Sequence, residues 1–204
     1  MKTLPDFRGF SLAALSDALD LLGIPGQCHG IKPVAPPERV VGPCFTVEYG
    51  PIEANPRGTV GDYIDEVPPG HVVLIANQGR TDCTVWGDIL TLAAKKRGIA
   101  GVVIDGVCRD SDGARTQRFP LFSKGTYMRT GKNRVALTAV QKTICVSGVK
   151  VSPGDVVVGS TDGVVFVPAA LQQKVAALAH DIEATESQIR AFVESGGSLK
   201  AARE

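Results

Sequence analysis

Two stretches of the chain carry apolar residues at helical spacing. In "SLAALSDALDLLG" (11–23), leucines recur every three or four residues, and Ser11 is suited to cap the first turn. The second stretch runs from about Ala169 to Val193, where apolar positions follow one another at intervals of 4, 3, 4, 7 and 3 residues, close to a heptad seam. These positions are Leu171, Val175, Leu178, Ile182, Ile189 and Phe192. We therefore expect an N-terminal helix and a long C-terminal helix, taken as 169–195.

The middle of the chain alternates between strand and helix patterns. "HVVLIA" (71–76) is a short β-branched run typical of a buried strand, and the polar "NQGRTDCTVWG" (77–87) is expected to be a loop. "DILTLAAKKRG" (88–98) has the pattern of a helix of about three turns with cations at its C-terminal end. "IAGVVIDG" (99–106) returns as a second buried strand. Strand, helix and strand form a βαβ unit, whose crossover should be right-handed.

Strand patterns dominate the rest of the chain. "VVGPCFTVEYG" (40–50) alternates like a half-buried strand, and "GTVGDYIDEVPPG" (58–70) resembles a short helix followed by a turn. Residues 134–168 alternate Val-rich runs with the turn signals Ser-Gly, Pro-Gly-Asp and Asp-Gly. The sequence contains no internal repeat, low-complexity tract or linker, so we expect a single α/β domain over 1–204.

The overall composition argues against several classes of protein. The chain has 204 residues, and its 22 basic and 21 acidic residues give a formal net charge of +1 without a basic stripe, so nucleic acid is not expected as a partner. The five cysteines are scattered and form no CxxC pair, which argues against a disulfide framework and a structural zinc site. The start "MKTLPDFRGF" lacks the apolar core of a signal peptide, and no run approaches the ~18 apolar residues of a membrane span. We expect a cytoplasmic protein without membrane contact.

The βαβ unit should bring charged residues from its two ends to one edge of the sheet. Asp88 begins the helix, and twenty residues separate it from Arg109, which Asp110 follows. The helix carries the chain down by roughly 15 Å at about 1.5 Å per residue, and the strand from Ile99 to Asp105 returns it by a similar distance at about 3.3 Å per residue. All three charged residues are therefore expected at the carboxyl edge of the strands, where open α/β sheets bind ligands.

The residue types at this edge suit a carboxylate-bearing small molecule held by a divalent cation. Unpaired N–H groups at the helix N-terminus can bind a carboxylate or phosphate, and Gly87 lets a ligand approach the backbone. Arg109 can donate its forked hydrogen bonds to a carboxylate or carbonyl oxygen, while Asp110 with nearby Asp88 offers oxygen ligands that suit Mg²⁺ or Mn²⁺. A second interpretation stays open at this point: Asp88 only caps a helix, and Arg109 and Asp110 only form a loop salt bridge.

The run "GDILTLAAKKRGIAGVVIDGVCRD" (87–110) resembles the RraA-like family, which includes 4-hydroxy-4-methyl-2-oxoglutarate aldolases, oxaloacetate decarboxylases and regulators of ribonuclease E activity. The likeness extends to "LSDALDLLG", "RFPLFSKG" and "VSPGDVVVGSTDGVVFVP" and so covers most of the chain. The metal-dependent aldolases of the family are marked by Asp, twenty residues and then Arg-Asp, a pattern that Asp88, Arg109 and Asp110 match. The regulators tend to lack the first Asp.

The resemblance implies a fold and an activity. The fold would be a compact α/β sandwich of the RraA-like type, with the βαβ unit carrying the site and a long C-terminal helix. The activity would be that of a divalent-metal-dependent pyruvate aldolase, with Mg²⁺ or Mn²⁺ as cofactor. Such an enzyme cleaves 4-hydroxy-2-oxo acids, for example 4-hydroxy-4-methyl-2-oxoglutarate, to pyruvate and a second keto acid, and it also decarboxylates oxaloacetate.

The resemblance also implies roles for individual residues. The substrate-binding residues would be Gly87, Asp88, Ile89, Leu90 and Arg109. The backbone of the first four would bind the carboxylate of a pyruvate moiety, Arg109 would contact its 2-keto oxygen, and Asp110 would hold the metal. Asp88 would position the metal-bound water that takes the proton from the C4 hydroxyl.

Assembly is the last property that the resemblance implies. The family forms trimers or hexamers with active sites between subunits, so we expect a homotrimer or homohexamer. A glutamate from the neighbouring C-terminal helix would hold metal-bound water. Glu186 is the candidate for this catalytic role and Glu183 the alternative, and a solvated helix face stays open as the explanation of either residue.

Rival chemistries have weaker support in the sequence. A Schiff-base aldolase needs a desolvated lysine, but Lys95 and Lys96 fall in the last turn of a helix, and Lys124 and Lys150 lie in or beside turns. Cys108 is better explained as a small buried residue than as a reactive thiol. The three histidines have no metal-ligand spacing.

A non-catalytic regulator that docks on a ribonuclease or helicase is the alternative from a different class. The complete pattern of Asp88, Arg109 and Asp110 counts against it. The sequence does not fix the natural substrate, and the residues that recognise its part beyond pyruvate are expected in loops such as 50–60 and 111–130.

Overall fold

The computed structural model describes residues 5–52 and 60–203. Within these residues, nine strands form one mixed sheet, and two more form a separate hairpin. The strands are β1 (Gln27–Cys28), β2 (Lys32–Ala35), β3 (Val40–Pro51), β4 (Val72–Thr84), β5 (Gly101–Val107), β6 (Leu121–Ser123), β7 (Val135–Val140), β8 (Ile144–Val146), β9 (Val149–Val151), β10 (Val156–Ser160) and β11 (Gly163–Val167). The helices are α1 (Leu12–Leu21), α2 (Asp88–Lys96), α3 (Ser111–Gln117) and α4 (Gln172–Glu194), with 3-10 turns η1 (Phe7–Gly9), η2 (Asp62–Glu66), η3 (Ala169–Leu171) and η4 (Ala201–Arg203).

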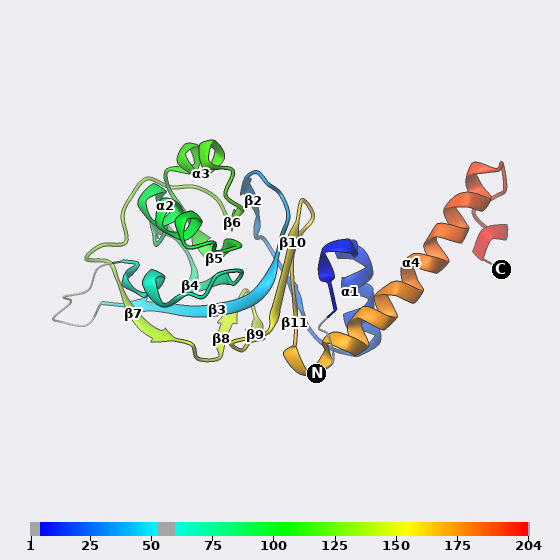
Figure 1. Ribbon diagram of the computed structural model, residues 1–204, viewed down its shortest axis with the longest axis horizontal. Coiled ribbons are helices and arrows are strands. Elements are labelled where there is room, and N and C mark those ends of the chain that lie inside the picture. Colours follow the sequence, from blue (N-terminus) through cyan, green and yellow to red (C-terminus); the bar gives the residue numbers. More distant parts are fainter. Residues whose placement is uncertain (1–4, 53–59, 204) are drawn as a thin grey trace.

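The large sheet has the order β1-β11-β10-β3-β4-β5-β6-β2, and β7 pairs with β3. Its central strands β3, β4, β5 and β6 run parallel to one another, whereas β1, β2, β7, β10 and β11 pair antiparallel with their neighbours. Helix α2 connects the parallel strands β4 and β5, which is the βαβ unit that the sequence predicts. Figure 1 shows α2 and α3 over one face of these strands and the β8–β9 hairpin on the other.

The apolar run that starts β4 is continuous because both faces of the sheet are covered. Val73 and Ile75 belong to the apolar core under α2 and α3. Val72 and Leu74 point the other way, into the core shared with the β8–β9 hairpin. Since the side chains of a strand alternate between its faces, neither face of this strand tolerates a polar pattern at these positions.

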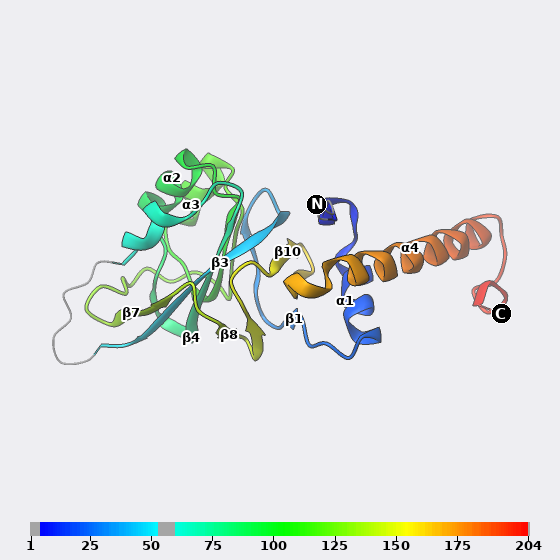
Figure 2. The same cartoon turned by 60° about the horizontal axis from the view of Figure 1, so that its bottom comes forward.

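The terminal helices pack together at the end of the sheet formed by β10 and β11. Leu15 and Leu19 of α1 and Val175 and Ala179 of α4 are fully buried in one apolar core with residues of β10 and β11. Figures 1 and 2 show α4 continuing beyond this core and away from the sheet. The predicted N-terminal and C-terminal helices are therefore confirmed, and Ser11 caps α1 by accepting a hydrogen bond from the N–H of Ala14 at 3.1 Å.

One prediction from the sequence, a loop after the first strand of the βαβ unit, is wrong. Residues 77–87 were expected to form a loop after the first strand, but β4 continues to Thr84. Its pairing with β5 shifts register twice, and Gln78 and Gly79 have positive φ angles of 55° and 67°. The strand therefore bulges where the sequence turns polar, and it resumes with Cys83 and Thr84 buried.

Other expectations agree with the structure where it describes the chain. The strand expected over 40–50 is β3, and the short helix expected within 58–70 is η2. Residues 58 and 59 lie outside the described residues. No helix in the described part of the chain is long and apolar enough to cross a membrane.

Candidate active site

The two ends of the βαβ unit meet at the N-terminus of α2. The Oδ2 atom of Asp110 lies 3.4 Å from the backbone N of Asp88 and 3.4 Å from Nε of Arg109. The N–H of Arg109 donates a hydrogen bond to the carbonyl oxygen of Trp86 at 3.0 Å, which ties the end of β5 to the residue before Gly87. Residues separated by about twenty positions in sequence thus form one cluster, as the strand and helix lengths predict.

Gly87 leaves the space that the two charged side chains occupy. A Cβ atom at this position would lie 2.7 Å from Oδ2 of Asp110 and 3.3 Å from Nε of Arg109. The backbone of Gly87 is extended, with φ −145° and ψ −168°, a conformation open to any residue. Glycine is therefore needed here for room beside the carboxylate and guanidinium and not for its backbone freedom.

A pocket of about 250 Å³ opens between this cluster and the strand end. It is lined by Val60, Thr84, Val85, Trp86, Gly87, Asp88, Ile89, Leu90, Arg109, Thr130 and Lys132. A second hollow of about 270 Å³ shares Arg109 and continues past Asp110, Thr126, Tyr127 and Met128. Arg109 thus lines both spaces, and Asp110 lines the second.

The floor of the pocket is held by a buried tryptophan. Trp86 is 2% exposed and stacks on Phe119 with ring centroids 6.2 Å apart. Its Nε1–H donates to Oγ1 of Thr91 at 2.9 Å, and that hydroxyl donates in turn to the carbonyl oxygen of Gly87 at 3.1 Å. The first turn of α2 is therefore fixed to the strand end through a chain of hydrogen bonds.

Asp110 is held in an uncommon backbone conformation. It precedes α3 with φ 55° and ψ 38°, in the left-handed region that Asp and Asn tolerate better than most residues. Its carbonyl oxygen accepts a hydrogen bond from the N–H of Gly113 at 3.0 Å. A Cβ atom at Gly113 would lie 2.9 Å from Cβ of Asp88, so a second glycine lets α3 approach α2.

Two N–H groups of the α2 N-terminus already have acceptors, which differs from the expectation that they are unpaired. The N–H of Ile89 donates to Oδ1 of Asp88 at 2.8 Å, and the N–H of Asp88 faces Asp110. The acceptors in both cases are carboxylate oxygens. This end of the helix is therefore already occupied by carboxylate oxygens of the protein itself, which its partial positive charge favours.

The acidic side chains near the pocket suit a hydrated cation rather than a fully protein-bound one. Among residues 5–52 and 60–203, no three His, Cys, Asp or Glu side chains come together as a metal cluster. The carboxylate of Asp110 is 41% exposed, so one oxygen donor with free space around it is available. Mg²⁺ is commonly bound through one or two carboxylates while it keeps several waters, and a single Asp fits that requirement.

The two glutamate candidates belong to α4, which projects away from the part of the chain that holds α2 and α3 (Figures 1 and 2). Glu186 forms an ion pair with Arg190 at 3.1 Å, one turn further along the helix. Glu183 instead accepts a hydrogen bond from the backbone N–H of Ser11 at 2.6 Å. The structure does not bring either residue to the site of its own chain, so only a second copy could receive them.

The lysines and the cysteine considered for rival chemistries are ion-paired, exposed or buried in the core. The ammonium group of Lys124 lies 2.7 Å from Oδ1 of Asp105, which is buried and also accepts hydrogen bonds from the N–H and the hydroxyl of Ser147. Lys95 and Lys96 are exposed. Cys108 is fully buried, as expected, and burial raises the pKa of its thiol.

Sequence reasoning missed four residues that line the pocket, which are Thr84, Val85, Trp86 and Lys132, whereas Val60 and Thr130 fall at the ends of the loops 50–60 and 111–130 that were expected to contribute. Trp86 supports the first turn of α2, while Thr130 and Lys132 approach from the segment before β7. The tryptophan is the single one in the chain and directly precedes the "GD" of the motif, which was the available signal. Nothing in the sequence indicates that Lys132 reaches this edge, because the bridge between Thr84 and Thr130 that places it there is a tertiary contact.

Comparison with known proteins gives consistent matches. The model of the RraA-like family, described as Aldolase/RraA, matches residues 12–166. DlpA of Legionella pneumophila is 39% identical over 196 residues, covering 94% of this chain, but the chain spans only about a third (32%) of that relative. A protein of Halalkalibacterium halodurans named "Putative 4-hydroxy-4-methyl-2-oxoglutarate aldolase" is 34% identical, covering 84% of this chain and 79% of the relative.

Solved structures give the same picture. An uncharacterized protein from Pseudomonas syringae pv. tomato matches with a TM-score of 0.88 and 44% identity over 96% of this chain and 94% of that one. RraAS2 of Streptomyces coelicolor, described as an unusual member of the RNase ES inhibitor RraA protein family, matches with a TM-score of 0.83 and 28% identity, covering 93% and 99% of the two chains.

Proposed function

Because the chain belongs to the RraA-like family, we propose that it is a divalent-metal-dependent lyase that forms a pyruvate enolate. It would cleave 4-hydroxy-2-oxo acids such as 4-hydroxy-4-methyl-2-oxoglutarate to pyruvate and a second keto acid, and it would also decarboxylate oxaloacetate. The observation that carries the proposal is the cluster at the N-terminus of α2, where Oδ2 of Asp110 lies 3.4 Å from both the backbone N of Asp88 and Nε of Arg109, beside the pocket that Arg109 lines. The name of the Halalkalibacterium relative supports the same class of activity.

The N-terminus of α2 is the proposed binding site for the pyruvate carboxylate. The residues from Gly87 to Leu90 line the pocket, and the absence of a side chain at Gly87 leaves room for the Asp110 carboxylate and the Arg109 guanidinium beside that backbone. Partial positive charge at a helix N-terminus favours an anion by roughly 0.3–1 kcal/mol at exposed sites. This interaction binds substrate and enolate alike, so it orients the molecule more than it accelerates the reaction.

Arg109 is the residue that we propose to act on the developing charge. Breaking the C3–C4 bond moves an electron pair toward the 2-keto oxygen, and a fixed cation beside that oxygen lowers the barrier. The guanidinium is already held by its ion pair with Asp110 and by the hydrogen bond of its backbone to Trp86. It therefore needs little rearrangement when the charge forms.

Asp110 would hold Mg²⁺ or Mn²⁺ through its exposed carboxylate, with Asp88 beside it. When bound, such a cation supplies Lewis-acid stabilisation of the enolate oxygen. We propose that Asp88 positions the water that accepts the proton of the C4 hydroxyl in aldol cleavage. Decarboxylation of oxaloacetate does not need this proton transfer, so the two reactions should depend differently on Asp88.

We propose a homotrimer or homohexamer in which α4 of one copy completes the site of the next. Two sets of exposed apolar side chains support this assembly. Ile89 lines the first hollow and is 77% exposed, Met128 lines the second and is 75% exposed, and Leu92 of α2 is also exposed. Phe192 and Val193 are exposed near the end of α4. Exposed apolar side chains are typical of interaction surfaces, and we propose that these two sets meet so that Glu186 comes near Asp110 of a second copy.

The pocket offers one further cation for the substrate. Lys132, from the segment before β7, also lines the pocket and is exposed. We propose that it receives the part of the substrate beyond pyruvate, which for an oxoglutarate-type acid carries a second carboxylate. The sources expected from the sequence were the loops 50–60 and 111–130. Thr130 of the second loop lines the pocket, and residues 53–59 of the first lie outside the described residues.

A non-catalytic regulator that binds a ribonuclease or helicase is the second candidate, favoured by the likeness to RraAS2. Pyruvate release from oxaloacetate and from a panel of 4-hydroxy-2-oxo acids, with Mg²⁺ or with EDTA, separates the two. The lyase predicts release with Mg²⁺ and its loss in EDTA. Asp110→Asn should abolish release while keeping the left-handed backbone that Asn tolerates, whereas Asp112→Asn, on the fully exposed face of the same helix, should not. A wild-type protein that releases pyruvate from none of these acids would favour the regulator.

A further inference from the structure

The packing of α4 against α1 and the sheet ends at the turn of the helix that contains Ile182. Val175 and Ala179 are fully buried against α1, and Ile182 is the last residue of α4 that packs on their core. Beyond this turn, the hydroxyl of Ser187 donates to the carbonyl oxygen of Glu183, and Arg190 pairs with Glu186, so these interactions stay within the helix. The direction of the projecting part is therefore fixed at residues 182 and 183.

Glu183 makes a specific contact at this turn. Its Oε1 accepts a hydrogen bond of 2.6 Å from the backbone N–H of Ser11, which is the N-cap residue of α1. The hydroxyl of Ser11 accepts in turn from the N–H of Ala14. The carboxylate of Glu183 thus lies at the positive end of α1, where a negative charge is stabilised. Two helices are joined here by a charged hydrogen bond in addition to their apolar contact.

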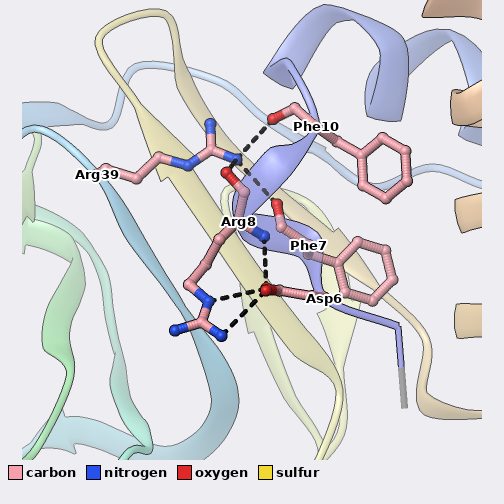
Figure 3. A network of polar contacts seen from close by, with 5 residues as sticks. All are labelled: Asp6, Phe7, Arg8, Phe10 and Arg39. Atoms are coloured by element: carbon pink, nitrogen blue, oxygen red, sulfur yellow. Dashed lines mark hydrogen bonds and ion pairs between the residues drawn. The ribbon is translucent and has the colours of Figure 1, made fainter. Parts of the chain in front are cut away.

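The partly buried Arg39 belongs to the same contact region. We call Glu183, Ser11 and Arg39 together the anchor of α4. Figure 3 shows Nη2 of Arg39, the residue before β3, donating to the carbonyl oxygens of Phe7, Arg8 and Phe10 at 2.9, 3.3 and 2.6 Å. Burial lowers the pKa of the Arg39 guanidinium, and the negative charge of Glu183 opposes this shift. The segment from Phe7 to Ser11 is therefore clamped between the start of β3 and α4.

We infer that Glu183 is a positioning residue: bound to Ser11 and close to Arg39, it sets the direction in which α4 leaves the domain. This inference rests on the proposed function, in which Glu186 acts in the site of a second copy. Glu186 lies three residues beyond the anchor, or about 4.5 Å along the helix. A tilt of about 10° at the anchor would move it by roughly 0.8 Å, and misplacement by about 1 Å can cost about 10²-fold in rate. The two glutamates therefore have different roles.

Subunit exchange between inactive variants tests this assignment. Glu183→Ala and Glu186→Ala should each lower kcat by about 10²-fold, since both fail to deliver a working Glu186. Each should regain activity when mixed with Asp110→Asn, because some sites then combine an intact α4 with an intact Asp110. Mixed with each other, the two glutamate variants should regain none, because neither chain donates a correctly placed Glu186. Glu183→Gln should be intermediate, since it keeps the acceptor and loses the charge. Asp181→Ala, on the exposed face of the same helix, should behave as wild type.

A distance measurement tests the role of the anchor independently of enzyme activity. Cys145 is exposed and the other four cysteines are buried, so a spin label can be placed on Cys145 and on Gln188→Cys and diluted into unlabelled Cys145→Ser protein. The distance distribution between the labels should be narrow in the wild-type background and with Glu186→Ala, and it should broaden or shift with Glu183→Ala. An unchanged distribution in Glu183→Ala, or restored activity in the mixture of the two glutamate variants, would overturn the inference. A wild-type enzyme without lyase activity would refute the proposed function instead, and the distance measurement would still decide on the anchor.

Discussion

Replacing Gly87 with Ala should lower the activity of the protein and leave its stability nearly unchanged. The backbone of Gly87 is extended, so alanine introduces no backbone strain. The new methyl group would instead enter the space between the Asp110 carboxylate and the Arg109 guanidinium. We expect a folded protein whose proposed metal ligand is displaced.

The size of the effect follows from the distances. The alanine Cβ would lie 2.7 Å from Oδ2 of Asp110, while ordinary van der Waals contacts start at 3.4 Å, so the carboxylate must retreat by about 0.7 Å. Misplacement of a reacting group by about 1 Å can cost about 10²-fold, which corresponds to roughly 2.7 kcal/mol of transition-state stabilisation. The free energy of unfolding should change little. Alanine restricts the unfolded chain more than glycine does, which stabilises the folded protein by about 0.4–1 kcal/mol where the native backbone conformation suits alanine.

The assay is pyruvate release from oxaloacetate in the presence of Mg²⁺, together with the Tm of the same preparation. Gly9→Ala is the matched control, because a Cβ atom at that position meets nothing within 4 Å. It should keep wild-type kcat/KM and Tm. The steric reasoning fails if Gly87→Ala keeps kcat/KM within about three-fold of the wild type, a difference of only ~0.7 kcal/mol.

Other predictions concern the arginine, the pocket floor and the cysteines. Arg109→Lys should lower kcat by about 10²-fold or more with little change in KM, because a lysine cannot reproduce the planar fork beside the forming charge; a change confined to KM would make the residue a simple carboxylate binder. Thr91→Val should lower the free energy of unfolding by about 1–3 kcal/mol in a denaturant titration, since it leaves the buried Nε1–H of Trp86 without an acceptor. Thiol labelling of the native protein at pH 8, read by mass spectrometry, should modify only Cys145, because the other cysteines are buried and burial raises the pKa of Cys28 to about 11; a second labelled cysteine would contradict the packing.

The helices that the sequence predicts are those whose apolar spacing reports burial on one face. The leucines of α1 and the first half of the α4 seam pack in a common core. The second half of that seam, with Phe192 exposed, does not pack on its own sheet. The periodicity predicted the helix over its whole length but could not tell contact within the chain from contact with a second copy.

The elements that were missed lack such a pattern. Helix α3, "SDGARTQ", buries only Ala114 and contains a glycine, so its helical form depends on packing against α2 and not on local preference. The continuation of β4 was read as a loop because its residues are polar. Its pairing with β5 across two register shifts is a tertiary effect that overrides this composition.

The candidate site was predictable in part for a geometric reason. The length of a βαβ unit is set by the rise per residue of helix and strand, so Asp88, Arg109 and Asp110 could be placed at one edge from spacing alone. The approach of Lys132 depends on how a distant segment folds back. The distinction between Glu183 and Glu186 likewise required the hydrogen bond from Ser11, which no spacing indicates.

The measurement that tests the central claim most directly is the exchange of the methyl protons of pyruvate in D₂O, followed by NMR. It detects formation of the pyruvate enolate without knowledge of the natural substrate. The account predicts exchange with wild-type protein and Mg²⁺, loss of exchange in EDTA, and loss in Asp110→Asn with Asp112→Asn unaffected. Exchange that persists in EDTA and in Asp110→Asn, or that is absent from the wild-type protein with Mg²⁺ and with Mn²⁺, would contradict it.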